Sequence, residues 1–328
     1  MVQSALGVNN FAVMLAESSD NGQTWRDHRV VWPQLAQRQS LFGSLSRDES
    51  GDLYLYGINI PISRVGETFW SDANQGMKQN SLFWARSRDD GRTWTEPKLM
   101  LLPYPGSAEA PGPLCVTRSG TWLACYAPYN TFDPQAKVER DRIVVMKSED
   151  QGSTWTAQTM MKFKDSESGG AEAWVVELSD GRLLGTCWNT SLNSNDNLPN
   201  AFALSGDAGR SWHPTGSTGT TGQSTSLLAL PDGRALMAYN QRKHGEPGVW
   251  IAEARPTPAD FGLVSNQLAW KASLTTRKGT SGTHDDWQDF AFGEPCLTWL
   301  GKDQLLLTLW SLEPGGEGIL FVKLRMIE

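Results

Sequence analysis

One motif recurs four times along this chain, Ser-x-Asp-x-Gly-x-(Thr/Ser)-Trp. The copies begin at residues 18, 87, 148 and 205 and read SSDNGQTW, SRDDGRTW, SEDQGSTW and SGDAGRSW. Five matching positions in four copies are not a chance pattern. A chain with repeats at this spacing is built from copies of one supersecondary unit, so the fold is expected to be repetitive throughout.

A second pattern alternates with the motif: an apolar run, a tight turn and another apolar run. Asp-Gly between β-rich runs is a strong hairpin signal. A further apolar run after each hairpin predicts a third strand. The predicted hairpins span 40–59, 113–130, 173–190, 226–242 and 295–311, and the predicted third strands span 81–86, 143–147, 201–204, 249–254 and 319–324.

Each unit thus contains a hairpin, a loop, a third strand, the motif and a fourth strand. Four antiparallel strands per unit describe a propeller blade, and no segment has a long helical period. We therefore predict an all-β, six-bladed β-propeller that forms a single domain over residues 1–328. The motif copy at Ser18 has no hairpin before it, so the first blade is expected to be incomplete at its N-terminal end.

The acids of the motif are its most recognisable residues, but we interpret them as structural. An Asp carboxylate and a Ser hydroxyl bond to backbone N–H groups in tight turns, and Gly supplies a backbone angle that other residues resist. The motif Trp is expected to pack between sheets. The four acids assigned this structural role are Asp20, Asp89, Asp150 and Asp207.

Composition excludes several classes of protein. The net charge of −7 and the lack of a Lys/Arg cluster argue against nucleic-acid binding, and no apolar run is long enough to span a membrane. The N-terminus has no signal-peptide pattern, so we expect a cytoplasmic protein, or a secreted one whose leader was removed. The four cysteines form no CxxC pair, which favours free thiols and predicts neither a metal site nor a cofactor.

The motif copies, with the hairpins between them, resemble the sialidase (neuraminidase) superfamily and its Asp-box or BNR repeats. The resemblance covers nearly the whole chain and implies a propeller that acts on or binds carbohydrate. Similar members include sialidases, exo-acting arabinanases, polysaccharide lyases and non-enzymatic binders. An oligosaccharide or polysaccharide is therefore the expected partner.

The resemblance also indicates where this chain departs from sialidases. The segment 172–182 looks like the stretch with the Glu that pairs with the sialidase nucleophile, and Glu172 matches that Glu. Glu294 stands where the nucleophilic Tyr is expected, and Asn189 and Asn200 stand where arginines are expected. Arg242 matches a third arginine. A carboxylate clamp needs paired guanidinium groups, so we do not expect a true sialidase.

Acids at the starts of the hairpins are the main catalytic candidates. Glu109, Glu172 and Glu294 come from three different units, and converging carboxylates suit glycoside hydrolysis, in which one acid protonates the leaving oxygen and another acts as nucleophile or base. Asp286, in the acid-rich segment 279–289, is a fourth candidate. Each of these acids also fits a solvated loop position without a function.

Substrate-binding candidates come from long loops and strand ends. The loop 61–79 is long for a propeller and carries aromatic and charged side chains, a composition typical of functional loops. The predicted binding residues are Arg64, Trp70, Asp72, Tyr129, Asn189, Arg242, His244 and His284.

The sequence as a whole favours an exo-acting glycoside hydrolase with paired carboxylates. One alternative is a polysaccharide or oligosaccharide lyase that acts on uronic acids, in which Arg242, His244 or His284 would neutralise the substrate carboxylate. Another alternative is a propeller that binds glycans without catalysis.

Overall fold

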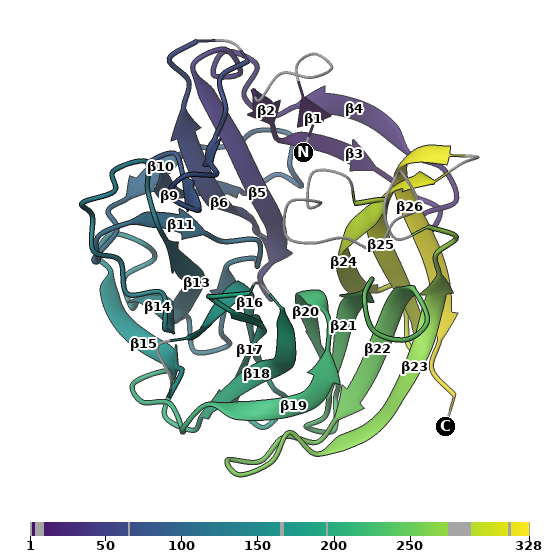
Figure 1. Cartoon of the computed structure of the whole chain (residues 1–328). Coiled ribbons are helices and arrows are strands. Elements are labelled where there is room, and N and C mark those ends of the chain that lie inside the picture. The colour runs from purple at the N-terminus through teal and green to yellow at the C-terminus, as the bar shows by residue number, and fades with distance from the viewer. Residues whose placement is uncertain are drawn as a thin grey trace. The chain divides into compact units, whose positions relative to one another are not determined.

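A computed structural model describes residues 2–3, 10–64, 66–164, 167–194, 196–274, 290–313 and 316–327. Every secondary-structure element in these ranges is a β-strand, which confirms the all-β prediction for this part of the chain (Figure 1). The residues group into two compact units, Met1–Thr159 (the N-terminal unit) and Met160–Glu328 (the C-terminal unit). Among the described residues, no helix has the length and apolar character needed to cross a membrane.

The N-terminal unit contains two large antiparallel sheets. In the first sheet, neighbouring strands follow the chain order β5-β6-β9-β10; in the second, β11 and β12 both pair with β13, followed by β14 and β15. The strands of the first sheet are β5 (Gln39–Arg47), β6 (Leu53–Pro61), β9 (Ser81–Ser87) and β10 (Lys98–Met100). Those of the second are β11 (Ser107–Glu109), β12 (Cys115–Val116), β13 (Trp122–Tyr129), β14 (Arg142–Ser148) and β15 (Thr156–Lys162), whose last residues belong to the C-terminal unit.

Three two-stranded sheets complete the N-terminal unit. They are β1 (Val2–Gln3) with β2 (Phe11–Ala12), β3 (Met14–Glu17) with β4 (Arg26–Val30), and β7 (Trp70–Ser71) with β8 (Gly76–Met77). The first motif copy lies between β3 and β4. In the described ranges this copy belongs to a two-stranded sheet and not to a full blade, in line with the expected incomplete first unit.

The C-terminal unit contains three sheets in which each strand pairs with the next along the chain. The strands of the first are β16 (Ser168–Glu177), β17 (Leu183–Ser191), β18 (Asn197–Ser205) and β19 (Gly216–Thr221). Those of the second are β20 (Gln223–Ala229), β21 (Ala235–Gln241), β22 (Gly248–Ala254) and β23 (Leu263–Lys271). The third has β24 (Phe292–Trp299), β25 (Gln304–Glu313) and β26 (Gly316–Arg325).

All five predicted hairpins and all five predicted third strands are confirmed. The third strands correspond to β9, β14, β18, β22 and β26. The hairpin turns use the glycines that the sequence pointed to, such as Gly181 at φ 87° and Gly233 at φ 84°. The five large sheets are blades of three to five strands, whereas the total of six blades and the single domain stay predictions.

The structural role assigned to the motif acids is also confirmed. In the third copy, Asp150 accepts hydrogen bonds from the backbone N–H of Thr154 at 2.8 Å and from its hydroxyl at 2.6 Å, and the Ser148 hydroxyl accepts one from the N–H of Gly152 at 2.8 Å. The other three copies repeat these bonds. A Cβ on Gly152 would lie 2.7 Å from the ring of Trp84, so the turn packs closely against the preceding blade.

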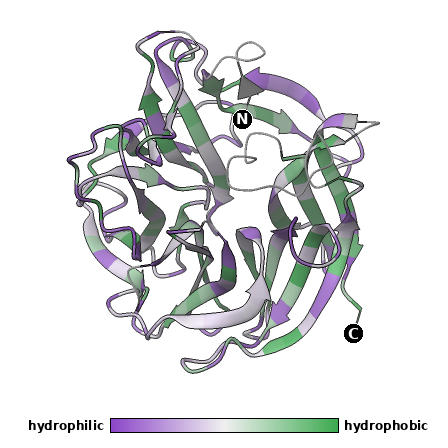
Figure 2. Ribbon diagram, viewed as in Figure 1, coloured by the Kyte–Doolittle hydropathy of each residue, from purple (hydrophilic) through white to green (hydrophobic). Residues whose placement is uncertain are grey.

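Hydrophobic residues lie mainly along the strands and hydrophilic residues in the connecting loops, as Figure 2 shows. Within the C-terminal unit, one buried cluster includes Phe202, Tyr239 and Phe261, and another includes Phe292 and Leu307. These clusters join consecutive sheets face to face. The four cysteines are free thiols, as expected, and two of them, Cys125 and Cys187, are buried.

Candidate active site

The first strand of each sheet in the C-terminal unit is interrupted at the same place. The pairing of β16 with β17 shifts between Ala171 and Trp174, and the equivalent shifts in β20 and β24 lie between Gln223 and Ser226 and between Gly293 and Cys296. Such β-bulges bend a strand and change the direction of a side chain. Three consecutive blades therefore carry an equivalent irregularity.

One residue at each bulge adopts the left-handed backbone conformation. These residues are Glu172 and Ser224, both at φ 53°, and Glu294 at φ 52°. Each lies nine positions before the turn residue of its hairpin, which is Gly181, Gly233 or Asp303. Non-glycine residues in this conformation cost about 1–3 kcal/mol and cluster at functional sites.

Ser224 connects the two glutamates. Its backbone N–H donates a short hydrogen bond to Oε2 of Glu172, and its hydroxyl donates one of 3.1 Å to Oε1 of Glu294. The hydroxyl of Thr225 donates to the carbonyl oxygen of Glu172 at 3.3 Å, which ties the bulge of β20 to that of β16. Both carboxylates thus bind the same residue, Ser224, although 122 positions separate them in the sequence.

Arg242 supplies positive charge beside this pair, but its guanidinium group is already bound. The side chain is 6% exposed, and its Nη1 donates to Oε1 of Gln223 at 2.6 Å. Its Nε donates at 3.1 Å to the carbonyl oxygen of Phe292, which also accepts from Nη2. The guanidinium carbon lies 4.0 Å from the ring centroid of Phe290 and 5.1 Å from that of Phe292.

The surroundings change the ionisation of all three groups. Loss of hydration and then the charge of Glu294 raise the pKa of Glu172 to about 8, against the opposing effect of Arg242. Loss of hydration also raises the pKa of Glu294, while Arg242 and the Ser224 hydroxyl oppose that rise. Loss of hydration lowers the pKa of Arg242 to about 10. Taken over the whole residue, Glu172 is half-buried and Glu294 is exposed.

Two of the remaining candidates in the C-terminal unit, Asn189 and His244, belong to the described residues. The side-chain amide of Asn189 donates to the carbonyl oxygen of Pro199 at 3.2 Å, and Asn189 lies on β17 beside the bulge of β16. His244 is exposed in the loop between β21 and β22. Asp286 and His284 lie outside the described residues, as does the whole acid-rich segment 279–289.

Five candidates belong to the N-terminal unit. Glu109 ends β11 opposite Ala127, and the pairing with β13 resumes at Cys115 opposite Leu123 after a shift of register. Glu109 does not adopt the left-handed conformation of Glu172 and Glu294. The ring of Tyr129 is buried, lying 6.4 Å from that of Trp70 and 4.8 Å below the guanidinium of Arg140. Arg64 and Asp72 are exposed in the loop 61–79. The catalytic or substrate-binding roles of these five residues stay predictions.

The sequence analysis missed Ser224 and Gln223. Ser224 could have been found by aligning the hairpins on their turns, because it occupies the position of Glu172 and Glu294 in the intervening unit. Gln223 has no such signal, since its role depends on the folded position of Arg242. No cluster of three potential metal ligands occurs in the described part of the chain.

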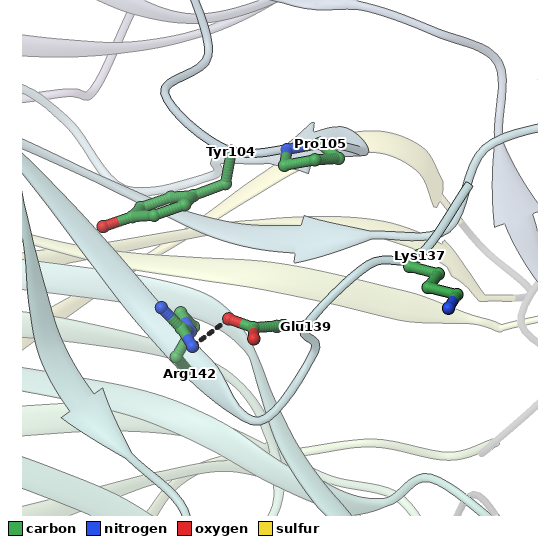
Figure 3. A pocket seen from close by; sticks show the side chains of 5 residues that line it. All are labelled: Tyr104, Pro105, Lys137, Glu139 and Arg142. Atoms are coloured by element: carbon green, nitrogen blue, oxygen red, sulfur yellow. Dashed lines mark hydrogen bonds and ion pairs between the residues drawn. The ribbon is translucent and has the colours of Figure 1, made fainter.

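A cavity of about 310 Å³ lies in the N-terminal unit, lined by Tyr104, Pro105, Lys137, Glu139 and Arg142 (Figure 3). Arg142 forms an ion pair with Glu139 and lies 5.3 Å from the ring centroid of Tyr104, and Lys137 adds a second positive charge to the lining. None of the predicted catalytic residues lines it. The cluster around Glu172 and Glu294 is therefore a better candidate for the active site than this cavity.

The antiparallel blades and the four motif copies are those of a sialidase-like β-propeller. Solved structures with this fold include a Dyadobacter fermentans protein of unknown function (TM-score 0.71, 19% identity, 97% of this chain and 85% of that chain covered). A Hadza microbial sialidase matches with a TM-score of 0.66 and 18% identity over 96% of this chain, which spans only 59% of that protein. An α-L-arabinofuranosidase of Fusarium graminearum, bound to an iminosugar inhibitor, matches with a TM-score of 0.58 and 15% identity, with 96% and 86% covered.

The BNR repeat-like domain matches residues 12–289, and the chain belongs to that family. This family assignment confirms the sialidase-like, Asp-box resemblance that the repeats indicated. None of the curated proteins matches the chain.

Proposed function

We propose that this protein is an exo-acting glycoside hydrolase in which Glu172 is the acid and Glu294 is the nucleophile or base. The observation that carries the proposal is the pair of carboxylates at equivalent bulges, joined through Ser224. Glycoside hydrolysis commonly uses two carboxyl groups with different protonation states. The exo-acting character rests on the family's propeller fold with its long rim loops, and on the similarity to an arabinofuranosidase.

The environment favours different roles for the two acids. The raised pKa of Glu172 keeps this group protonated at neutral pH, so that it can donate its proton to the glycosidic oxygen as the bond to the sugar breaks. Loss of hydration raises the pKa of Glu294 as well, but Arg242 and the Ser224 hydroxyl oppose that rise by favouring the ionised form. An ionised Glu294 can attack the anomeric carbon or deprotonate a water molecule.

The same features argue against a sialic acid substrate. Glu294 stands where the resemblance leads one to expect a tyrosine, and Asn189 and Asn200 stand where it leads one to expect arginines. Three of the five N–H groups of Arg242 already donate to protein acceptors. A sugar carboxylate would thus meet two acids and a guanidinium that is already bound. A neutral sugar at the chain end is the substrate class that we propose.

The test is incubation of the protein with a panel of neutral oligosaccharides, sialosides and uronate polymers, followed by mass analysis of the products. Release of a neutral monosaccharide from chain ends, with a gain of one water, is the expected result. Efficient release of sialic acid would contradict the argument from Arg242. An unsaturated uronate product would support the lyase alternative, and binding without any product would support a glycan-binding propeller.

A further inference from the structure

Ser224 occupies an unusual position between the two proposed catalytic acids. It lies at the bulge of β20, in the blade that follows the Glu172 blade and precedes the Glu294 blade along the chain. A serine at φ 53° is strained, and nothing in the packing of a β-strand requires it. The strain is therefore expected to serve the contacts that this conformation makes possible.

Ser224 has two hydrogen-bond donors, and each binds a different glutamate. The backbone N–H binds Glu172, and the hydroxyl, which has a single proton to donate, binds Glu294 at 3.1 Å. Among the described residues, this hydroxyl is the one hydrogen-bond donor to the Glu294 carboxylate. Removal of the hydroxyl would leave the N–H contact to Glu172 in place, so the two contacts can be separated experimentally.

The backbone around Ser224 is held independently of its side chain. Thr225 donates to the carbonyl oxygen of Glu172 at 3.3 Å, and its hydroxyl lies 3.2 Å from that of Thr186 on β17. Gln223, on the other side, accepts from Arg242. Loss of one hydroxyl should therefore leave the bulge in place.

We propose that Ser224 is a positioning residue, which fixes the two carboxylates in one relative geometry and holds the Glu294 carboxylate ready to react. It acts through Glu294 and needs no contact with the substrate. This inference rests on the proposed function for its kinetic consequences, whereas the geometric part concerns the folded protein alone.

The test compares Ser224→Ala and Ser224→Gly with Ser226→Ala. The two changes at 224 both remove the hydroxyl, but glycine also relieves the left-handed strain, so the two should affect stability in opposite directions. Ser226 is a matched control, because it lies two residues further along β20, is fully buried, and has an Oγ atom with no hydrogen-bond partner among the described residues.

In the kinetic arm, a neutral substrate identified by the panel is used. Both variants at 224 should lower kcat by about 10- to 100-fold with little change in KM, as expected for loss of a hydrogen bond to a charged group. The acidic limb of the pH profile should move to higher pH, because Glu294 loses a contact that favours ionisation. Ser226→Ala should change neither kcat nor the pH profile. Recovery of activity in Ser224→Gly would overturn the proposal, since relief of strain would then explain the effect.

The second arm requires no turnover. The full-length protein is labelled with ¹³C at the glutamate carboxyl groups, and the titrations are assigned with Glu172→Gln and Glu294→Gln. The pKa of Glu294 should be higher by about 1 in Ser224→Ala than in the unchanged protein and in Ser226→Ala. Identical titrations would overturn the proposal even if a glycan is hydrolysed. The expected difference in a protein that turns over no glycan would support the positioning role while the hydrolase proposal fails.

Discussion

The hairpins β5–β6 and β16–β17 derive from the same repeat but differ in regularity. The pairing of β5 with β6 continues without a shift from Gln39 opposite Pro61 to Arg47 opposite Leu53. The pairing of β16 with β17 shifts at Glu172. Nine positions before the turn glycine, the first hairpin has Phe42, whose ring lies 4.6 Å from that of Phe11, and the second has Glu172.

This difference shows how one supersecondary unit serves two purposes. A regular strand points alternate side chains into the packing between blades, and Phe42 packs against the buried cluster of the N-terminal unit. A bulged strand takes one residue out of that alternation and makes it available to solvent. We therefore expect changes at the bulges to alter chemistry more than stability, and changes in the regular hairpin to do the reverse.

The largest effect is expected for Glu172→Gln and Glu294→Gln. Each change removes a group that donates or accepts a proton, so kcat should fall by about 10²- to 10⁴-fold. The melting temperature should stay the same or rise, because a carboxylate that is costly to desolvate is replaced by a neutral amide. Glu49→Gln, in the exposed β5–β6 turn, is the control. A loss of folding in either variant would contradict the separation of chemistry from packing.

The pH dependence should be the next largest effect. With Glu172 as the acid, kcat/KM should fall about tenfold per pH unit above pH 8, the value to which the pKa of Glu172 is raised. In stability, the folded protein keeps a proton on Glu172 between pH 4.5 and about 8 that the unfolded chain has lost. The free energy of unfolding should therefore decrease as the pH rises through this window.

Urea unfolding at several pH values measures this slope. Glu172→Gln should remove the part of the slope that Glu172 contributes. Phe42→Leu, in the regular hairpin, should leave the slope as it is. An equal slope in Glu172→Gln would mean that this carboxyl group has an ordinary pKa in the folded protein.

A smaller effect, on stability alone, is expected at two glycines of the N-terminal unit that have similar backbone angles. Gly152 has φ 79° and Gly120 has φ 84°. A Cβ on Gly152 would meet the rings of Trp84 and Trp122, whereas one on Gly120 would meet nothing within 4 Å. Gly120→Ala should cost about 1 kcal/mol from backbone strain, and Gly152→Ala about 2–4 kcal/mol because steric overlap is added. Equal losses would show that the motif turn does not pack tightly between blades.

The smallest effect is expected for Phe42→Ala. This change should lower the free energy of unfolding by about 2 kcal/mol, because the side chain is only partly buried. The pH profile of activity should keep its shape. A displaced acidic or basic limb in this variant would show that the regular hairpin also contributes to the ionisation of the acids.

Much of the fold followed from the sequence because its signals are local. The turn glycines and the Ser and Asp of the motif act within eight residues, and the hairpins, the third strands and the role of Asp150 were all predicted correctly. The first unit was less regular, since its strands β3 and β4 pair only with each other in the described ranges. Of the three predicted glutamates, Glu172 and Glu294 are joined through Ser224, while Glu109 lies in the other unit, and the catalytic roles of all three stay predictions.

The sequence alone determined the repeat, the all-β class and the two glutamates at equivalent positions, because periodic patterns and turn chemistry depend on neighbouring residues. Only the tertiary structure decided that Ser224 joins these acids and that Arg242 is bound by Gln223 and Phe292. The contacts of Ser224 with Glu294 and of Arg242 with Phe292 span 70 and 50 positions and depend on how consecutive blades pack, whereas the contact of Arg242 with Gln223 lies within one hairpin. The identity of a residue shows which bonds it can form, but its folded surroundings determine which of them remain available to a substrate.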